Sequence, residues 1–209
     1  PHLAPRHRRD RVETIVMASN PLDLPPTPLG RGRGEVAAPA FALLFSELVQ
    51  YHQSRSLDIS ALERALEDAG ADVGRRSYES ISYREKASGS KREHRLLPLL
   101  QFIQSSCWRS MFGRVADSLE VYDDDEYLLS DRDCLVNRFI SVPKDLGDLN
   151  CGAFTAGFVR GILHAAGFPA KVSAYYSEPN PAADINGVRT TNILMKFERE
   201  VIEREARLG

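Results

Sequence analysis

One apolar segment with regularly spaced small residues constrains the fold of this chain most. Residues 153–166 form a stretch in which four small residues recur every four positions: Ala153, Gly157, Gly161 and Ala165. This spacing places them on one helix face, which carries almost no side chains and lets another backbone approach closely. Each internal glycine costs about 1 kcal/mol relative to alanine, so close packing must compensate. Gly167 and Pro169 predict the end of the helix, through a left-handed cap and a residue that cannot continue it.

Composition and charge are those of an ordinary soluble globular chain. The 209 residues are 43% hydrophobic and 27% charged, with a formal net charge of −2, so nucleic acid is not an expected partner. No apolar run approaches the roughly 18 residues of a membrane span, and no apolar segment follows the basic N-terminus as in a secretory signal. The three widely spaced cysteines predict buried thiols in a reducing compartment. We therefore expect a cytoplasmic protein.

The sequence divides into an N-terminal arm and one folded domain. Residues 1–38 hold six of the 27 basic residues and six of the 12 prolines without hydrophobic periodicity, which predicts a disordered arm. Residues 39–207 predict a single domain. Its expected elements are helices at 39–54, 60–69, 73–86, 95–112 and 115–122, strands at 127–132 and 134–142, the glycine-rich helix, strands at 170–177 and 190–198, and a last charged helix. This order predicts an α+β fold with helices packed on a four-stranded antiparallel sheet.

The first predicted helix carries an unusually wide apolar stripe. Its apolar and aromatic side chains cover an arc of about 160°, wider than the usual stripe of a helix packed on one core. Two interpretations are open: a well-buried core helix, or a helix that contacts its own core on one side and a partner on the other. We favour the second. The candidate interface residues are Phe41, Leu44, Phe45, Leu48, Tyr51 and His52.

Motif analysis predicts no catalytic, metal or cofactor site. Cys151 stands near a helix start that can stabilise a thiolate, but His164 lies thirteen residues further on, roughly 20 Å along the same helix. A structural thiol is therefore favoured over a cysteine enzyme. The sequence contains no CxxC or HExxH, and the acidic run 123–126 lacks the spacing of a calcium loop and predicts a solvated turn. Trp108 lies in an apolar helix, where a core position is favoured over a ligand gate.

A set of segments, taken in chain order, carries a resemblance to a known family. They are AFALLFSELVQ (40–50), the pair Gly70 and Gly74, WRSMFG (108–113), FISVPKDLGDLNC (139–151), AFTAGFVRGIL (153–163), GFPAKV (167–172) and ILMKFE (193–198). Together they resemble the small subunits of the transport protein particle (TRAPP) complex. The resemblance spans about residues 35–205 and implies the Bet-three-like fold, in agreement with the predicted order of elements.

That resemblance implies a function in membrane traffic. Members of this family are scaffold subunits of a complex that exchanges nucleotide on a Rab-family GTPase in endoplasmic reticulum-to-Golgi and intra-Golgi transport. It implies a heterodimer with the Bet-three-type subunit 3 through the early helices and contact with the longin-like subunit 2 on another face. It further implies indirect contact with the Rab protein, and a cytoplasmic chain held peripherally at cis-Golgi and endoplasmic reticulum membranes through the complex.

One departure from the family pattern concerns a lipid. The Bet-three-type paralogue carries an acylated cysteine just before the fourth helix, whereas the matching stretch here, residues 88–95, is SGSKREHR. We therefore expect neither acylation nor a fatty-acyl ligand. The alternative function is a sensor domain of the same fold that binds a small hydrophobic ligand.

Overall fold

The computed structural model describes residues 36–87, 93–140, 142, 147, 149–178 and 189–208. The chain separates into two units, Pro1–Arg33 and Gly34–Gly209, and every described residue belongs to the second. Nearly all of the expected arm over residues 1–38 lies outside the described residues, and so do residues 88–92 of the stretch that lacks the acylated cysteine.

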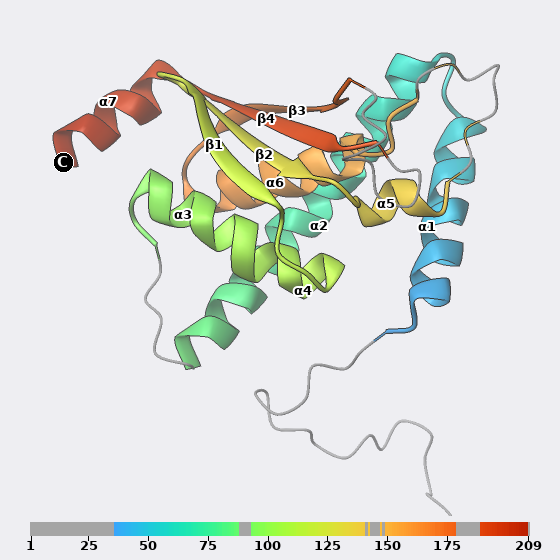
Figure 1. The fold of residues 1–209 in the computed structure, drawn as a ribbon, viewed down its shortest axis with the longest axis horizontal. Coiled ribbons are helices and arrows are strands. Elements are labelled where there is room, and N and C mark those ends of the chain that lie inside the picture. Colours follow the sequence, from blue (N-terminus) through green and yellow to red (C-terminus); the bar gives the residue numbers. More distant parts are fainter. Residues whose placement is uncertain are drawn as a thin grey trace, which may run out of the picture. The chain divides into compact units, whose positions relative to one another are not determined.

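The second unit contains helices and one antiparallel sheet. Its elements are α1 (Ala38–Gln53), α2 (Ile59–Ala87), α3 (Leu96–Phe102), the π-helical turn η1 (Ile103–Cys107), α4 (Trp108–Phe112), β1 (Ser118–Asp123), β2 (Glu126–Asp131), α5 (Leu135–Arg138), α6 (Ala153–Ala166), β3 (Ala170–Tyr176), β4 (Thr191–Phe197) and α7 (Arg199–Leu208). The strands lie in the order β1-β2-β4-β3 (Figure 1), and all neighbouring pairs are antiparallel. The predicted α+β fold with a four-stranded antiparallel sheet is confirmed.

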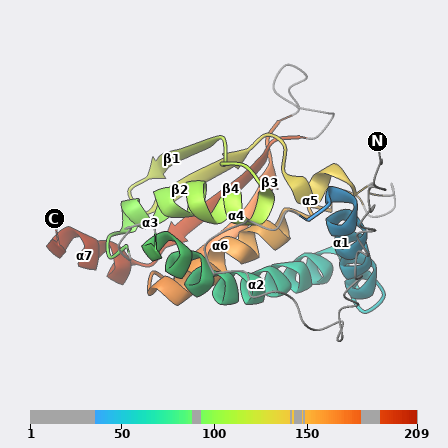
Figure 2. The ribbon, with the colours of Figure 1, turned by 90° about the horizontal axis from the view of Figure 1, so that it is seen from below.

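The inner face of the sheet supplies one side of the core. Alternation along β4 buries Ile193, Met195 and Phe197, and Leu129 of β2 lies directly opposite Ile193. Helix α6 packs on this face, and α2 packs on α6, so α6 lies between the sheet and α2 (Figure 2). Because α6 is covered on both sides, most of its residues are buried.

Helices α2 and α6 cross at four glycines. Gly70 and Gly74 lie against the backbone of α6, and Gly157 and Gly161 lie against the backbone of α2. At each of the four, an added Cβ would overlap a carbonyl oxygen of the other helix. The two backbones are therefore in direct contact, which is what the small face of α6 predicts.

The predicted break between residues 69 and 73 is wrong, because α2 is one continuous helix of 29 residues. Gly70 ends no helix here. It stands in the middle of α2, where the contact with α6 compensates for the low helix propensity of glycine. Tertiary packing therefore overrides the local stop signal.

The predicted helix over residues 95–112 is a single helical run with an irregular centre. α3, η1 and α4 follow one another without a break, and Gly113, with φ of 79°, ends the run. Trp108 is fully buried, and its Nε1–H donates to Asp131 Oδ2 at 2.8 Å. This bond ties the end of the helical run to strand β2.

Two further predictions are wrong around the first hairpin. Residues 118–122 of the expected helix 115–122 lie in strand β1, and residues 134–142 contain helix α5 where a strand was expected. The acidic run supplies the tight turn that joins β1 to β2, which keeps β1 beside β2. Strand β2 then pairs with β1 on one side and β4 on the other, so residues 134–142 cannot form a hairpin with β2.

Candidate functional site: the outer face of helix α1

Helix α1 begins and ends with clear local signals. Pro39 stands in its first turn, where a missing N–H costs nothing. At its C-terminus, Ser54 Oγ donates to the carbonyl of Tyr51 at 2.9 Å, and Ser56 Oγ donates to the carbonyl of His52 at 2.9 Å. These bonds satisfy carbonyl groups that the helix itself leaves open. α1 is therefore a well-defined helix at both ends.

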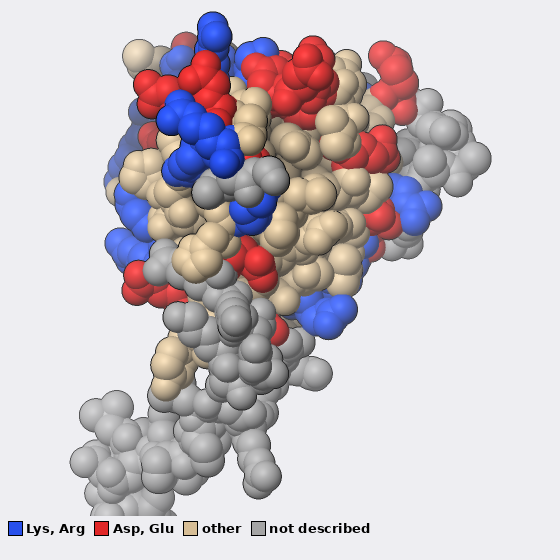
Figure 3. Space-filling model, turned by 90° about the vertical axis from the view of Figure 1, so that its left-hand side faces the viewer, with Lys and Arg blue, Asp and Glu red and all other residues tan. Residues whose placement is uncertain are grey.

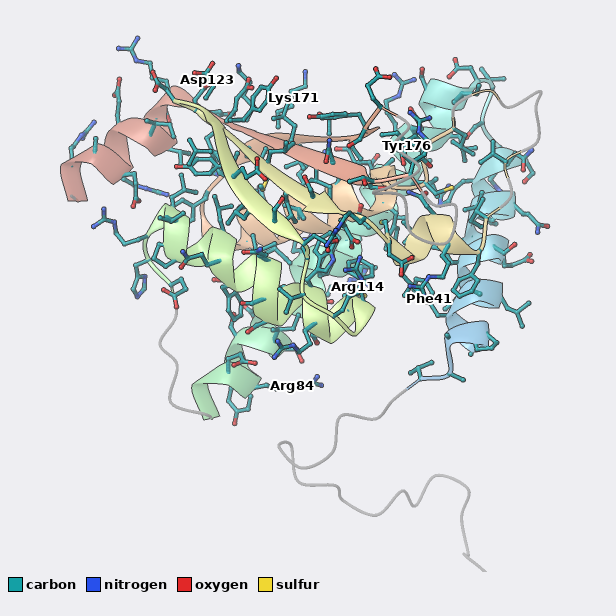
Figure 4. The ribbon with its side chains drawn as sticks, in the orientation of Figure 1. Phe41, Arg84, Arg114, Asp123, Lys171 and Tyr176 are labelled. Atoms are coloured by element: carbon teal, nitrogen blue, oxygen red, sulfur yellow. The ribbon has the colours of Figure 1, made fainter. Side chains whose placement is uncertain are left out.

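The inner side of α1 is part of the core. Phe45 is 4% exposed and packs edge-on against Phe154 of α6, with ring centroids 5.3 Å apart. Phe41 stacks on Phe45 at 5.9 Å and points toward the rest of the domain (Figure 4). His52 is half-buried and lies seven residues after Phe45, on the same side of the helix. Aromatic pairs of this kind contribute about 1 kcal/mol each beyond their buried area, so this side attaches α1 to α6.

The outer side of α1 carries a row of apolar residues that the described part of the chain leaves mostly uncovered. We define the outer row as Ala40, Leu44, Leu48 and Tyr51. Their spacing of four, four and three residues places them along one helix face. Leu44 is 73% exposed and Tyr51 is 51% exposed, while Leu48 is half-buried at the boundary with the core. Leu43, on the next face, is also exposed.

The six predicted interface residues therefore fall into two groups. Phe41 and Phe45 pack on the core, and Leu44, Leu48 and Tyr51 belong to the outer row. His52 is half-buried between them, and its ring packs edge-on against Tyr51 with centroids 5.2 Å apart. The width of the stripe predicted two surfaces, and the structure places a core on one of them. Arg55 was missed by the sequence analysis, although its position four residues after Tyr51 continues the outer row.

Two residues predicted to have packing roles, Gly167 and Pro169, are exposed and instead mark the end of α6. Gly167 has φ of 84°, and the N–H of Phe168 donates to the carbonyl of Leu163 at 2.9 Å, which closes α6 with a left-handed cap. Pro169 follows, exposed, just before β3. The cap turns the chain sharply from α6 into the neighbouring strand.

The thiols of the described chain are buried and their pKa values are raised. Burial raises the pKa of Cys151 to about 12 and that of Cys134 to about 11, and the pKa of Cys107 is raised as well. His164 is exposed near the other end of α6 from Cys151. A thiol with a raised pKa is a poor nucleophile at neutral pH, so this geometry argues against the cysteine-enzyme interpretation.

A groove beside the α2–α6 crossing has charged rims. Its volume is about 300 Å³, and Asp68, Asp72 and Arg75 of α2 face Arg160 and His164 of α6 across it. Arg160 pairs with Asp68 at 2.7 Å, and Arg75 pairs with Asp72. The first pair joins the two helices across the groove, and the second lies within α2. Among the described residues, no group of three or more metal-ligating side chains comes together.

Surface charge near α7 is mixed in sign. Figure 3 views the side of the domain where α7 lies and shows Lys and Arg interspersed with Asp and Glu. Arg199 pairs with Glu203 at 2.7 Å within α7, and Arg95 pairs with Glu205 at 2.6 Å. Across the described ranges, none of the helices combines the length and the hydrophobicity needed to span a membrane.

Comparison with known sequences points to one family. A sequence model of the transport protein particle (TRAPP) component family matches residues 41–197. Trafficking protein particle complex subunit 5 of Dictyostelium discoideum is 46% identical over 192 residues, which cover 91% of this chain and all of that protein. The human protein of the same name is 41% identical over 86% of this chain and 90% of its own length.

A solved structure has the same fold. It is a trafficking protein particle complex subunit 3 from Naegleria fowleri, described as covalently bound to palmitic acid. Its TM-score is 0.62 at 18% identity, covering 78% of this chain and 95% of that chain. At this identity the similarity concerns the fold. The family match and the subunit 5 relatives lead to one conclusion. This chain belongs to the transport protein particle (TRAPP) component family.

Proposed function

We propose that this chain is a non-catalytic scaffold subunit of the TRAPP complex that pairs with the Bet-three-type subunit 3 through the outer row of α1. The longin-like subunit 2 binds another face, and the Rab-family GTPase contacts the assembly rather than this chain. The complex exchanges Rab nucleotide in endoplasmic reticulum-to-Golgi and intra-Golgi transport. The chain is cytoplasmic and is held at cis-Golgi and endoplasmic reticulum membranes through the complex.

The exposed outer row of α1 is the observation that carries this proposal. A helix whose inner side packs on α6 still presents Leu44 and Tyr51 to solvent. Large apolar side chains exposed along one helix face are typical of a protein–protein interface. Obligate heterodimers bury about 2,000 Å² or more and have apolar centres, which fits a row of leucines ending in a tyrosine. Family membership supplies the class of partner.

The first test is assembly with the proposed partner. This chain is co-expressed with a Bet-three-type subunit 3 and analysed by size exclusion with light scattering. We expect a stable 1:1 complex, and aggregation of the chain when it is expressed alone. A well-behaved monomer that elutes apart from subunit 3 would contradict the heterodimer. Mass spectrometry of any copurified small molecule would then test the ligand-sensor alternative.

A matched pair of substitutions locates the interface on α1. Leu44→Asp places a charge in the outer row, and we expect it to weaken binding of subunit 3 by about 2–4 kcal/mol, as for a central interface residue. Leu97→Asp is the control, because it makes the same change at an exposed leucine on α3 instead of α1. Leu97 is 47% exposed. Equal binding by the two variants would remove the outer row from the interface. Circular dichroism checks that both variants are folded.

The proposal includes no acyl group on this chain. The subunit 3 relative is described as bound to palmitic acid, but residues 88–95 here contain no cysteine. The three cysteines of the chain are all buried with raised pKa values. Intact-mass spectrometry of the purified complex should give the unmodified polypeptide mass for this subunit. A mass increase equal to a palmitoyl group would contradict this part of the proposal.

A further inference from the structure

We infer that Arg55 binds a carboxylate of the partner subunit at the C-terminal end of the outer row. This inference rests on the proposed heterodimer and specifies the chemistry of the partner surface. The outer row requires apolar side chains on the partner surface. Arg55 requires an acidic side chain there, aspartate or glutamate. The two requirements together define which surface fits and in which direction it lies along α1.

The guanidinium of Arg55 is held in place by its neighbours. Its central carbon lies 3.7 Å from the centroid of the Tyr51 ring, in a stacked cation–π contact. Its Nη1 donates to the carbonyl of Tyr51 at 3.1 Å and to Ser54 Oγ at 3.2 Å. Arginine normally loses much side-chain freedom when it binds, and a preformed stack reduces that loss. Arg55 is therefore preorganised although its residue surface is exposed.

No carboxylate of the described part of the chain forms an ion pair with Arg55. The nearby acidic residues are used elsewhere or stand apart. Asp58 Oδ1 accepts the N–H of Ala61 at 2.6 Å at the start of α2, and Glu47 is exposed on α1 two turns before Arg55. The bonds to Arg55 use Nη1, while a planar guanidinium offers five N–H donors, enough for a bidentate carboxylate on its other edge.

The position of Arg55 relative to the apolar residues favours a protein partner. Leu44, Leu48, Tyr51 and Arg55 follow one another at spacings of four, three and four residues. A partner surface that covers the two leucines also excludes water from the Tyr51 ring and from the guanidinium stacked on it. Tyrosine and arginine are enriched among the residues that dominate binding energy in interfaces. A carboxylate placed there gains from reduced solvent screening.

The test measures binding of subunit 3 by this chain at two salt concentrations. Arg55→Glu should weaken binding about tenfold or more at about 50 mM salt and by about threefold at about 500 mM, because salt screens a partly exposed pair. Arg84→Glu is the control, with the same change of charge. Arg84 is exposed near the C-terminal end of α2, away from α1 (Figure 4), and its variant should bind within about twofold of the parent chain.

A second variant separates partner binding from helix capping. Arg55→Gln keeps an amide donor for the Tyr51 carbonyl and loses the charge. If Arg55 binds a carboxylate, Arg55→Gln binds subunit 3 more weakly and with a smaller salt dependence than the parent chain. If Arg55 only caps α1, Arg55→Gln binds like the parent chain with an unchanged salt dependence, and the inference is overturned.

Failure of the inference and failure of the proposed function give different results. If Leu44→Asp abolishes binding while Arg55→Glu binds like Arg84→Glu at both salt concentrations, the heterodimer stands and the carboxylate is excluded. If the parent chain does not bind subunit 3 at all, both are overturned. Loss of binding by Leu44→Asp together with the salt-dependent loss by Arg55→Glu supports both.

Discussion

Helices α2 and α1 both pack against α6, but they do so in opposite ways. The α2–α6 crossing brings two backbones together through Gly70, Gly74, Gly157 and Gly161, and no side chain at those positions separates them. α1 instead uses the aromatic rings of Phe41 and Phe45, which attach only one side of the helix. The other side remains exposed at Leu44 and Tyr51.

The difference separates what the chain completes by itself from what it leaves for another chain. Backbone contact leaves no room for a side chain at the four glycines, and both helices of this contact belong to the same chain. A one-sided aromatic attachment leaves an apolar surface whose burial requires a partner. The crossing should therefore govern the stability of the single chain, and the outer row should govern assembly.

The largest effect is expected at the crossing. Gly157→Val places a branched side chain where even a Cβ overlaps a backbone carbonyl of α2. We expect a loss of about 4 kcal/mol or more in the free energy of unfolding, or failure to fold, because overlap with backbone cannot be relieved by rotamer changes. Urea unfolding followed by circular dichroism measures it. A stability within about 1 kcal/mol of the parent chain would show that the helices can move apart.

Substitutions on the two sides of α1 should change the free energy of unfolding by different amounts. Phe45→Ala removes a ring packed on Phe154 and should lower the free energy of unfolding by about 3 kcal/mol. Leu44→Ala should change it by less than about 0.5 kcal/mol, because Leu44 is mostly exposed in the single chain. The same unfolding experiment compares them. If Leu44→Ala proves as costly as Phe45→Ala, the outer row is part of the core and the comparison fails.

A smaller effect is expected at a glycine of a different kind. Gly167 has φ of 84° and open space around it, so Gly167→Ala should cost about 1–2 kcal/mol through backbone strain alone. Thermal unfolding of this variant beside Gly157→Val distinguishes strain from steric overlap. A loss at Gly167 as large as at Gly157 would indicate an unrecognised contact at the end of α6.

The smallest effect concerns pH. Burial raises the pKa of Asp117, but hydrogen bonds from Arg132 and the charge of Arg114 outweigh it, so the pKa lies below its ordinary value of 3.8. The stability that this carboxylate contributes is present above the unfolded pKa and is lost as pH falls through the lower folded pKa.

Asp117→Asn should therefore reduce the loss of stability between about pH 6 and pH 3 by roughly 0.5 kcal/mol, a value kept small by solvent screening. Urea unfolding at both pH values measures the difference. Identical acid sensitivity of the two chains would show that the Arg132 and Arg114 contacts do not favour the charged form. The glycine crossing contains no titrating side chain at its four contact positions and should contribute equally at both pH values.

Much of this architecture was predictable because local patterns and tertiary contacts agree. Period-two alternation at Ile193, Met195 and Phe197 predicts β4, and Gly167 predicts the end of α6; both are observed. The errors lie where tertiary contacts decide. Gly70 has the local properties of a helix stop, but the backbone of α6 lies against it. Residues 115–122 were predicted as a helix, but residues 118–122 lie in strand β1 because they pair with β2.

The apolar stripe of the candidate site was predictable from the sequence, but which of its residues face the core was not, and its role as an interface stays a prediction. The width of the stripe on α1 indicated two surfaces. The helical periodicity of α1 alone does not show which side faces α6. That required the position of Phe154, which lies far along the chain and packs on Phe45. Arg55 stands after the last residue of α1, so helix periodicity excluded it, and only its stacking on Tyr51 reveals its place in the row.

Hydrogen–deuterium exchange of the chain alone and in complex with subunit 3 tests the central claim most directly. The account predicts that binding slows exchange across Ala38–Gln53 and the residues just after it, while α7 and the C-terminal end of α2 near Arg84 exchange at unchanged rates. Slowed exchange at α7 or at the Arg84 end of α2 with none in α1 would contradict it, and would place the partner on a different face.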